Sequence, residues 1–398
     1  MSIDILCHLW VQTNGAKMKR KMGLVVAGLA AIAVGCGSDE RVAADGVDSG
    51  DGWGVVDGGA VIDAGGGDGG RVVRDDGGTP ISPLDGGVLP AASVSPLAAT
   101  LGQLRALAVD DTNAFLLAAG AGGQVVSCSA ANCGATTLVR SALAAPIYGT
   151  ATIDAFGGRV YFNEGAQLRR ASADGSSLQS IPTGGTLFVA SPFVPVGTDF
   201  YVQVQPASGP GAPANPPTFR LFSQAALTAG TPVSLAVTGE AQLVVEGNRR
   251  FAAPIGAVGP FVGVDTQTNA TWSTPNTKVK RHGVGATLNH VFFIDAASST
   301  LRVCPAATSC PSPSVALTGS TFEELRIDGA DLVLATKDNV VHRCKAADVA
   351  AGAACPALKY VAAPTAGTTF VGFQMNASGY FFLRGNAAGG GELVRLPR

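Results

Sequence analysis

Six cysteines show the clearest spacing pattern among the chemically reactive side chains of this sequence. They form three local pairs: Cys128 with Cys133, Cys304 with Cys310, and Cys344 with Cys355. None of the pairs has the Cys-x-x-Cys spacing, and a zinc site would need four ligands in one place. We therefore predict three structural disulfides, each closing a hairpin, as is typical of an exported protein.

Three further clusters contain charged side chains that a ligand could meet. They are the basic residues Lys278, Lys280, Arg281 and His282, the pair Asn163 and Glu164, and the pair Glu323 and Glu324. The basic cluster suits an anionic glycan, a phosphate or an acidic protein. The carboxylate and amide oxygens of the two pairs could together hold a divalent cation. A simpler interpretation is also open, in which each cluster lies in a solvated connecting loop.

Known catalytic motifs are absent from the sequence. There is no Gly-x-Ser-x-Gly, no His-Glu-x-x-His and no phosphate-binding Gly-Lys-Ser/Thr loop. His290 and His342 are interpreted as ordinary residues on or beside strands. We predict no catalytic residue and no cofactor, with the divalent cation left as an open possibility.

Composition restricts the class of protein. Only 14% of the residues are charged, the net charge is −2, and residues 99–398 contain 20 basic and 17 acidic side chains. This balance gives no support for nucleic-acid binding. No run of 18 apolar residues occurs, which excludes a multi-span membrane protein. The 53 glycines favour many short strands joined by tight turns.

The elements that must position these clusters form a repeat. A turn containing Asp or a similar residue, followed by an aromatic or branched strand, recurs near residues 115, 160, 200, 250, 291, 332 and 380. The spacing of about 40–50 residues is that of propeller blades, and each copy has room for four short strands. The repeat resembles the broad β-propeller class without matching a subfamily. We predict an all-β, seven-bladed β-propeller over residues 92–398. A six- or eight-bladed ring and a pair of β-sandwiches are the alternatives.

The two ends of the repeat region predict how the ring closes. The seventh copy stops at Arg398 after its third strand, whereas residues 93–100 resemble the fourth strands of the other copies. We expect residues 93–100 to complete the seventh blade, because closure leaves no long unpaired edge.

Residues 1–35 have the pattern of an export signal. Three basic residues, 19–21, precede an apolar stretch of 14 residues that ends in Ala33-Val34-Gly35-Cys36. The stretch has the length of a signal peptide, and its end resembles a bacterial lipobox. The resemblance implies a covalent lipid on Cys36, and Met18 fits the true translation start.

Residues 36–91 have the composition of a tether. Eleven acidic and three basic residues follow Cys36 among many glycines. Such a segment buries too little apolar surface to offset its ordering entropy, so we expect a disordered linker. The linker resembles the Gly/Asp-rich spacers of bacterial lipoproteins.

These observations favour a lipid-anchored, monomeric protein of the bacterial cell envelope. Its propeller would bind or scaffold a protein or glycan partner and would not bind nucleic acid. One alternative is an exported metal-assisted hydrolase or lyase. Another, by analogy with lipoprotein propellers that serve outer-membrane protein insertion, is an envelope-assembly factor. Fold alone does not decide among these functions.

Overall fold

The computed structural model describes residues 92–398 with short gaps at 120–122, 145–151, 166, 183–185, 189–191, 207–216, 236, 238, 256, 319–320 and 359–363. The predicted signal peptide and the lipid site Cys36 lie outside the described residues. So does the 36–91 linker, apart from the strands β1 (Trp53–Val56), β2 (Ala60–Asp63), β3 (Val73–Arg74) and β4 (Pro80–Ile81), which pair in that order. These four short strands differ from the disordered linker that the composition of the segment predicts.

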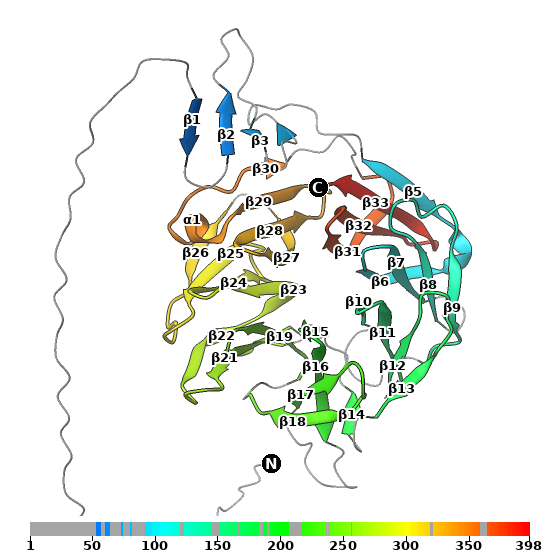
Figure 1. The fold of residues 1–398 in the computed structure, drawn as a ribbon, viewed down its shortest axis with the longest axis horizontal. Coiled ribbons are helices and arrows are strands. Elements are labelled where there is room, and N and C mark those ends of the chain that lie inside the picture. Colours follow the sequence, from blue (N-terminus) through cyan, green and yellow to red (C-terminus); the bar gives the residue numbers. More distant parts are fainter. Residues whose placement is uncertain are drawn as a thin grey trace, which may run out of the picture. The chain divides into compact units, whose positions relative to one another are not determined.

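Seven antiparallel sheets follow one another around a ring in Figure 1, so the predicted seven-bladed β-propeller is confirmed. Blade one consists of β6 (Gln103–Val109), β7 (Asn113–Ala119), β8 (Gln124–Ser129) and β9 (Thr137–Ser141). Blade two consists of β10 (Ile153–Phe156), β11 (Arg159–Glu164), β12 (Gln167–Ala171) and β13 (Gln179–Ile181). Blade three consists of β14 (Thr186–Phe188), β15 (Val194–Val196), β16 (Asp199–Pro206), β17 (Thr218–Ser223) and β18 (Ala229–Val233). In blade three, β14 and β15 both pair with β16.

The other four blades have four strands each. Blades four to seven are β19 (Ala241–Glu246), β20 (Arg249–Pro254), β21 (Gly259–Asp265) and β22 (Thr271–Thr277); β23 (Val279–Ala286), β24 (His290–Asp295), β25 (Leu301–Pro305) and β26 (Ser314–Leu317); β27 (Phe322–Asp328), β28 (Asp331–Thr336), β29 (Val341–Lys345) and β30 (Ala357–Leu358); and β31 (Thr368–Asn376), β32 (Gly379–Asn386), β33 (Gly391–Pro397) and β5 (Ser93–Leu97). Two short helices complete the described part, the 3-10 helix Ala99–Leu101 and α1 (Ala346–Ala350). Within that part, no helix is long and apolar enough to cross a membrane.

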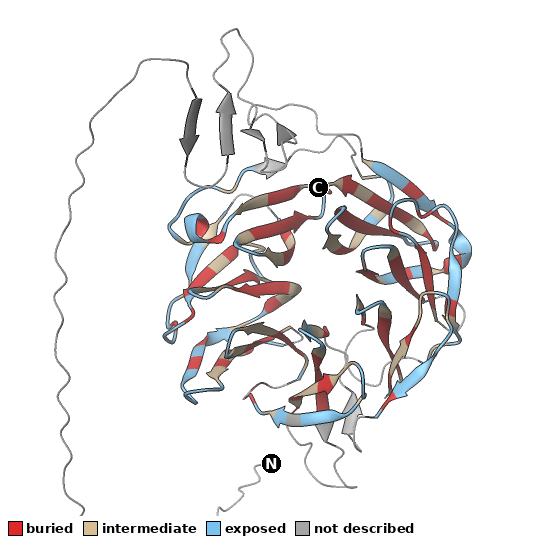
Figure 2. Ribbon diagram, viewed as in Figure 1, coloured by how far each residue is buried: buried red, intermediate tan, exposed pale blue. Residues whose placement is uncertain are grey.

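The second strand of each blade carries the repeat that the sequence revealed. In β24 the run from Val291 to Ile294 is fully buried. Val291 and Phe293 pack in one core cluster, whereas Phe292 and Ile294 pack in the next. A strand covered on both faces reads as a continuous apolar run, because alternate side chains enter the cores on its two sides. Figure 2 shows the same burial along the middle of the other blades.

The ring closes as the sequence predicted. β5 pairs with β33 and forms the fourth strand of blade seven. Gly390, at φ +68°, lies against this junction and donates its N–H to the carbonyl oxygen of Gly102. A Cβ at position 390 would clash with the carbonyl oxygens of Leu97 and Ala98, so only glycine fits.

The three predicted disulfides are present. Cys128–Cys133, Cys304–Cys310 and Cys344–Cys355 each join the third strand of a blade to the connection that follows it. The first cysteine of each pair follows its repeat position by 12 or 13 residues and occupies the same place in three blades, the end of the third strand.

Candidate functional site

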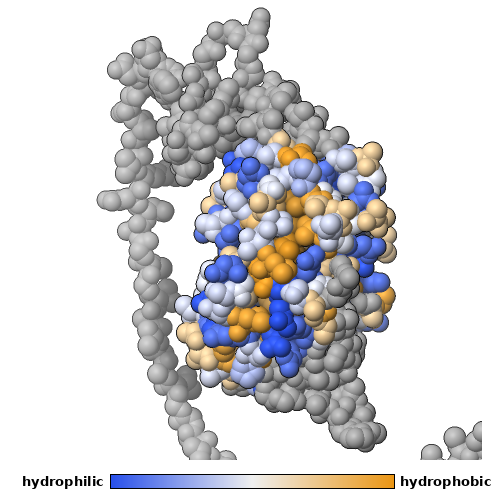
Figure 3. Space-filling view, turned by 90° about the vertical axis from the view of Figure 1, so that its right-hand side faces the viewer, coloured by the Kyte–Doolittle hydropathy of each residue, from blue (hydrophilic) through white to orange (hydrophobic). Residues whose placement is uncertain are grey.

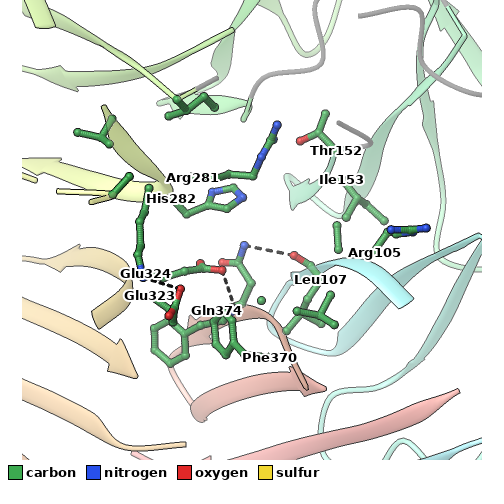
Figure 4. Close-up of a pocket in the computed structure, with 18 of the residues that line it drawn as sticks. Arg105, Leu107, Thr152, Ile153, Arg281, His282, Glu323, Glu324, Phe370 and Gln374 are labelled. Atoms are coloured by element: carbon green, nitrogen blue, oxygen red, sulfur yellow. Dashed lines mark hydrogen bonds and ion pairs between the residues drawn. The ribbon is translucent and has the colours of Figure 1, made fainter. Parts of the chain in front are cut away.

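A pocket of about 400 Å³ opens at the end of the central channel where the inner strands begin. Its walls come mainly from the inner strands of blades one, five, six and seven, as Figure 4 shows. Six of the eight sequence-predicted residues line it: Lys278, Lys280, Arg281, His282, Glu323 and Glu324. The fold therefore brings the basic cluster and one acidic pair into a single site.

Bulges in the inner strands aim side chains into this pocket. In β6, β27 and β31 the pairing register shifts by one residue, and the extra residues are Arg105, Glu323 and Val371. All three line the pocket. A bulge leaves one residue out of the ladder of backbone hydrogen bonds and changes the direction of its side chain. The bulges of three blades therefore turn three side chains towards this end of the channel, which we call the channel mouth.

Blade five has a longer irregularity at the equivalent place. The register of β23 shifts between Val279 and Val284, and His282 between them has a left-handed φ of +57°. Its imidazole extends into the cavity in Figure 4. Burial, helped by the positive charges of Arg326 and Arg281, lowers the pKa of His282 well below its usual value. The ring is therefore neutral at pH 7 and can donate one hydrogen bond and accept another.

Positive charge is in excess at the channel mouth. Lys280 Nζ lies 2.8 Å from Glu323 Oε2, and Arg281 pairs with Glu240 beside the pocket. Burial lowers the pKa of Arg281 to about 10, which still leaves the guanidinium protonated at pH 7. Among the described residues, Arg105 and Lys278 form no ion pair with a carboxylate. Their charges are available to an anionic ligand.

Glu324 ties three inner strands together beneath the mouth. Its Oε1 accepts a hydrogen bond from the backbone N–H of Phe373 at 3.1 Å, and its Oε2 accepts one from Arg326 Nη2 at 2.7 Å. Arg326 also donates to the carbonyl oxygens of His282 and Phe373. Burial raises the pKa of Glu324 to about 7, although these bonds favour the ionised form. Both oxygens of Glu324 are thus committed to the scaffold.

A second cavity of about 440 Å³ continues along the channel and shares His282 and Gln374 with the first. Asp154 of β10 lines it, and burial raises the pKa of this carboxyl group to about 6. Gln242 is only 7% exposed; its Nε2 donates to the Val284 carbonyl oxygen, while its Oε1 has no hydrogen-bond partner. The channel therefore offers polar groups below the mouth.

Asn163 and Glu164 do not join this site, and the simpler interpretation that they lie in a solvated loop is also wrong. Both are buried at the end of β11. Asn163 Oδ1 accepts a hydrogen bond from the Thr152 N–H at 2.8 Å. The Glu164 carboxylate accepts hydrogen bonds from the guanidinium groups of Arg140 and Arg169, each at an N–O distance of 2.7 Å. Burial opposes ionisation, but these two guanidinium groups hold the pKa of Glu164 below its usual value.

The other two clusters also lie on strands, apart from Lys278, which connects β22 of blade four to β23 of blade five. Lys280, Arg281 and His282 belong to β23, and Glu323 and Glu324 belong to β27. Bulges disturb the alternating pattern there, which made the segments resemble loops. No cluster of three His, Cys, Asp or Glu side chains placed for a metal ion occurs among the described residues.

Sequence reasoning missed Arg105, Asp154 and Arg326. One signal could have found Arg105, because it precedes the repeat position 115 by ten residues, much as Glu323 precedes 332 by nine. Arg326 follows the bulge of β27, whereas Asp154 lies in β10, whose pairing with β11 is regular; only the strand register places these two side chains.

No protein-family profile and no curated protein sequence matches this chain. Solved structures do. A catalytically inactive variant of virginiamycin B lyase from Staphylococcus aureus with quinupristin is 10% identical, with a TM-score of 0.50, over 77% of this chain and 99% of its own. BamB from Moraxella catarrhalis is 11% identical, with a TM-score of 0.46, over 79% and 94%. YCF48 bound to a D1 peptide is 12% identical, with a TM-score of 0.48, over 78% and 98%. At 10% identity and a TM-score of 0.50, the likeness to the lyase concerns the fold alone.

Proposed function

We propose that this chain is a lipid-anchored envelope protein whose propeller binds an acidic segment of a partner protein at the channel mouth. The observation that carries the proposal is the set of bulged inner strands that gathers basic side chains around one pocket. Arg105 and Lys278 contribute charges that no described carboxylate neutralises. A cleft lined by one sign of charge attracts and orients a partner of the opposite sign.

Anchoring and export form the second part of the proposal. The order of basic, apolar and small residues before Cys36 supports lipid attachment there. Three disulfides in one domain support an oxidising compartment such as the periplasm or the cell surface. The acidic linker would then hold the propeller away from the membrane.

Peptide binding tests the proposal. The probe is a fluorescein-labelled octamer of glutamate, and its binding to the full chain is followed by fluorescence anisotropy. The double charge reversal Arg105→Glu with Lys278→Glu is expected to weaken binding at least tenfold. The matched control is Lys337→Glu, because Lys337 is an exposed turn residue outside the pocket.

Three outcomes would overturn the proposal. They are the absence of glutamate-octamer binding, an equal loss of affinity in the control variant, and tighter binding of a heparin oligosaccharide than of the peptide. The last outcome would assign the mouth to an anionic glycan. An envelope-assembly role would instead require outer-membrane defects after gene deletion that the charge-reversed chain fails to correct.

An enzymatic role is the second candidate, because burial raises the pKa of Asp154 to about 6 within the channel. A carboxyl group with a pKa near neutrality can act as a general acid or base. The test is hydrolysis of a panel of chromogenic esters and glycosides by the full chain. Turnover that is lost in Asp154→Asn but retained in Lys337→Glu would move this candidate ahead of binding.

A further inference from the structure

A third pocket, outside the channel, lies between blades two and three. Its volume is about 420 Å³, and it is lined by turns of both blades, including Gly157 after β10 and Thr198 before β16. Ser223 and Gln224, at the end of β17, close it from the side of blade three. The turns of this pocket follow the inner strands, whereas the channel mouth lies where inner strands begin. This third pocket and the channel mouth are therefore on opposite faces of the ring.

Three side chains of blade two converge on this pocket. Tyr161 lies directly opposite Arg170 in the pairing of β11 with β12, and Arg159 precedes Tyr161 by two residues. Successive side chains of a strand point to opposite faces, so these three share the face that packs against blade three. The Tyr161 ring stacks on Phe156 at 4.1 Å and contacts Phe200, which fixes the direction of its hydroxyl group.

The two guanidinium groups are held in place by neutral partners. Arg159 donates to Ser172 Oγ, and Arg170 donates from Nε to Gln179 Oε1 at 2.8 Å and from Nη1 to the Gln224 carbonyl oxygen. Each guanidinium has five N–H donors, so donors remain for a ligand. These contacts orient the groups without neutralising their charge.

No carboxylate compensates these charges within the described propeller. Neither Arg159 nor Arg170 has a carboxylate within ion-pair distance there, and the lining contains no Asp or Glu. The stretches omitted between 92 and 398 contain no Asp or Glu either. Asp174 is exposed and outside the lining; bonds with Ser176 chiefly hold its pKa below the usual value, and Arg159 adds a smaller effect.

The Tyr161 hydroxyl provides a second, independent observation. Tyr161 is fully buried, and its hydroxyl group interacts with the Arg170 guanidinium, but no contact of the hydroxyl oxygen has the full geometry of a hydrogen bond. A buried hydroxyl without a well-formed hydrogen bond costs free energy that a bound ligand would recover. Hydroxyl groups of Thr198 and Ser223 lie around the same space.

We propose that this pocket binds a small molecule carrying a tetrahedral oxyanion, a phosphate or a sulfate ester, through Arg159, Arg170 and the Tyr161 hydroxyl. Two unneutralised guanidinium groups match the double charge of a phosphate monoester and suit multidentate oxygen recognition. A carboxylate has fewer oxygens and a single charge, so it would satisfy fewer of these donors.

Calorimetric titration of the full chain at low ionic strength tests the proposal with three probes: inorganic phosphate, inorganic sulfate and acetate. Whichever of phosphate and sulfate binds more tightly is expected to bind at least tenfold more tightly than acetate. The comparison of phosphate with sulfate then identifies the ligand as a phosphate ester or a sulfate ester. Arg159→Gln is expected to weaken that binding at least tenfold, and Tyr161→Phe about threefold. Lys337→Gln serves as the control because its side chain is exposed and distant from the lining.

The variants are chosen so that a folding defect does not imitate a binding defect. Arg159→Gln and Tyr161→Phe keep the bond between Arg170 and Gln224 that joins the two blades. Unchanged phosphate and sulfate binding in both variants would overturn the proposal and leave the arginines as structural clamps. So would acetate binding as tight as phosphate binding, or the absence of saturable binding by any probe.

Discussion

Val94 and Val394 are directly paired across two neighbouring strands of blade seven, although 300 residues separate them in the sequence. Val94 belongs to β5 and is 47% exposed, whereas Val394 belongs to β33 and is buried. The two ends of the propeller therefore share one sheet. Figure 3 shows the side of the molecule that carries β5 and β9, where apolar groups interrupt a polar surface.

The closing strand gives a stability prediction. Leu97 of β5 is 7% exposed and packs in the core cluster between blades seven and one. Leu97→Ala is expected to lower the free energy of unfolding by about 2–4 kcal/mol, because it removes buried methyl groups and leaves a cavity. Val94→Ala on the same strand is the control, with a loss below about 1 kcal/mol. Denaturant unfolding of the oxidised protein measures both, and equal losses would show that β5 does not close the ring.

The disulfides give a second prediction. Cys304 and Cys310 are buried, and the disulfide between them spans six residues. Replacing both with serine is expected to lower the free energy of unfolding by about 2 kcal/mol, since the unfolded chain gains freedom. Denaturant midpoints with and without reductant provide the measurement. A midpoint that stays unchanged on full reduction would contradict a stabilising role for all three disulfides.

A third prediction concerns pH. Burial raises the pKa of Glu324 to about 7 from an ordinary 4.5, so the folded state binds a proton more tightly than the unfolded state. Stability from this group is complete below about pH 4.5 and is lost as the pH rises towards 7. Glu324→Gln is expected to flatten the decline in unfolding free energy between pH 5 and pH 7. An unchanged slope in the variant would contradict this assignment, whereas the wild-type slope by itself also contains contributions from His282 and Asp154.

The anchor gives a fourth prediction. Cys36→Ser removes the proposed lipid attachment site and is expected to move the chain from the membrane fraction to the soluble fraction. Several acyl chains are needed for stable anchoring, so partial release is not expected. Cell fractionation followed by immunoblotting gives the readout, with Ser49→Ala in the acidic linker as the control. An unchanged membrane fraction in Cys36→Ser would refute lipid attachment at this residue.

The blade count and the closing strand could be predicted from the sequence because both depend on apolar runs and turns. Repeat position 291 predicted a second strand, and Val291 lies in β24. Cys128, Cys304 and Cys344 follow repeat positions 115, 291 and 332 by 13, 13 and 12 residues, so their shared place in three blades also followed. These features are local and recur, which makes them visible without a partner strand.

The geometry of the channel mouth could not be predicted in the same way. The position of a bulge depends on the neighbouring strand with which the residue pairs. The residue types of Arg105 and Glu323 therefore do not reveal that both are left out of the ladder of backbone hydrogen bonds. The positions of Asn163 and Glu164 depended on Arg140 and Arg169 from neighbouring strands, which turned a predicted loop into a buried ion-pair cluster. Long-range register decided each of these placements.

Lysine footprinting tests the central claim most directly, because it locates the bound segment on the protein. The full chain is acetylated with and without the glutamate octamer, and modification is measured by mass spectrometry. The account predicts that the peptide slows acetylation of Lys278 at least fivefold and leaves exposed Lys337 unchanged. Equal acetylation of Lys278 with and without saturating peptide would contradict an acidic partner at the channel mouth.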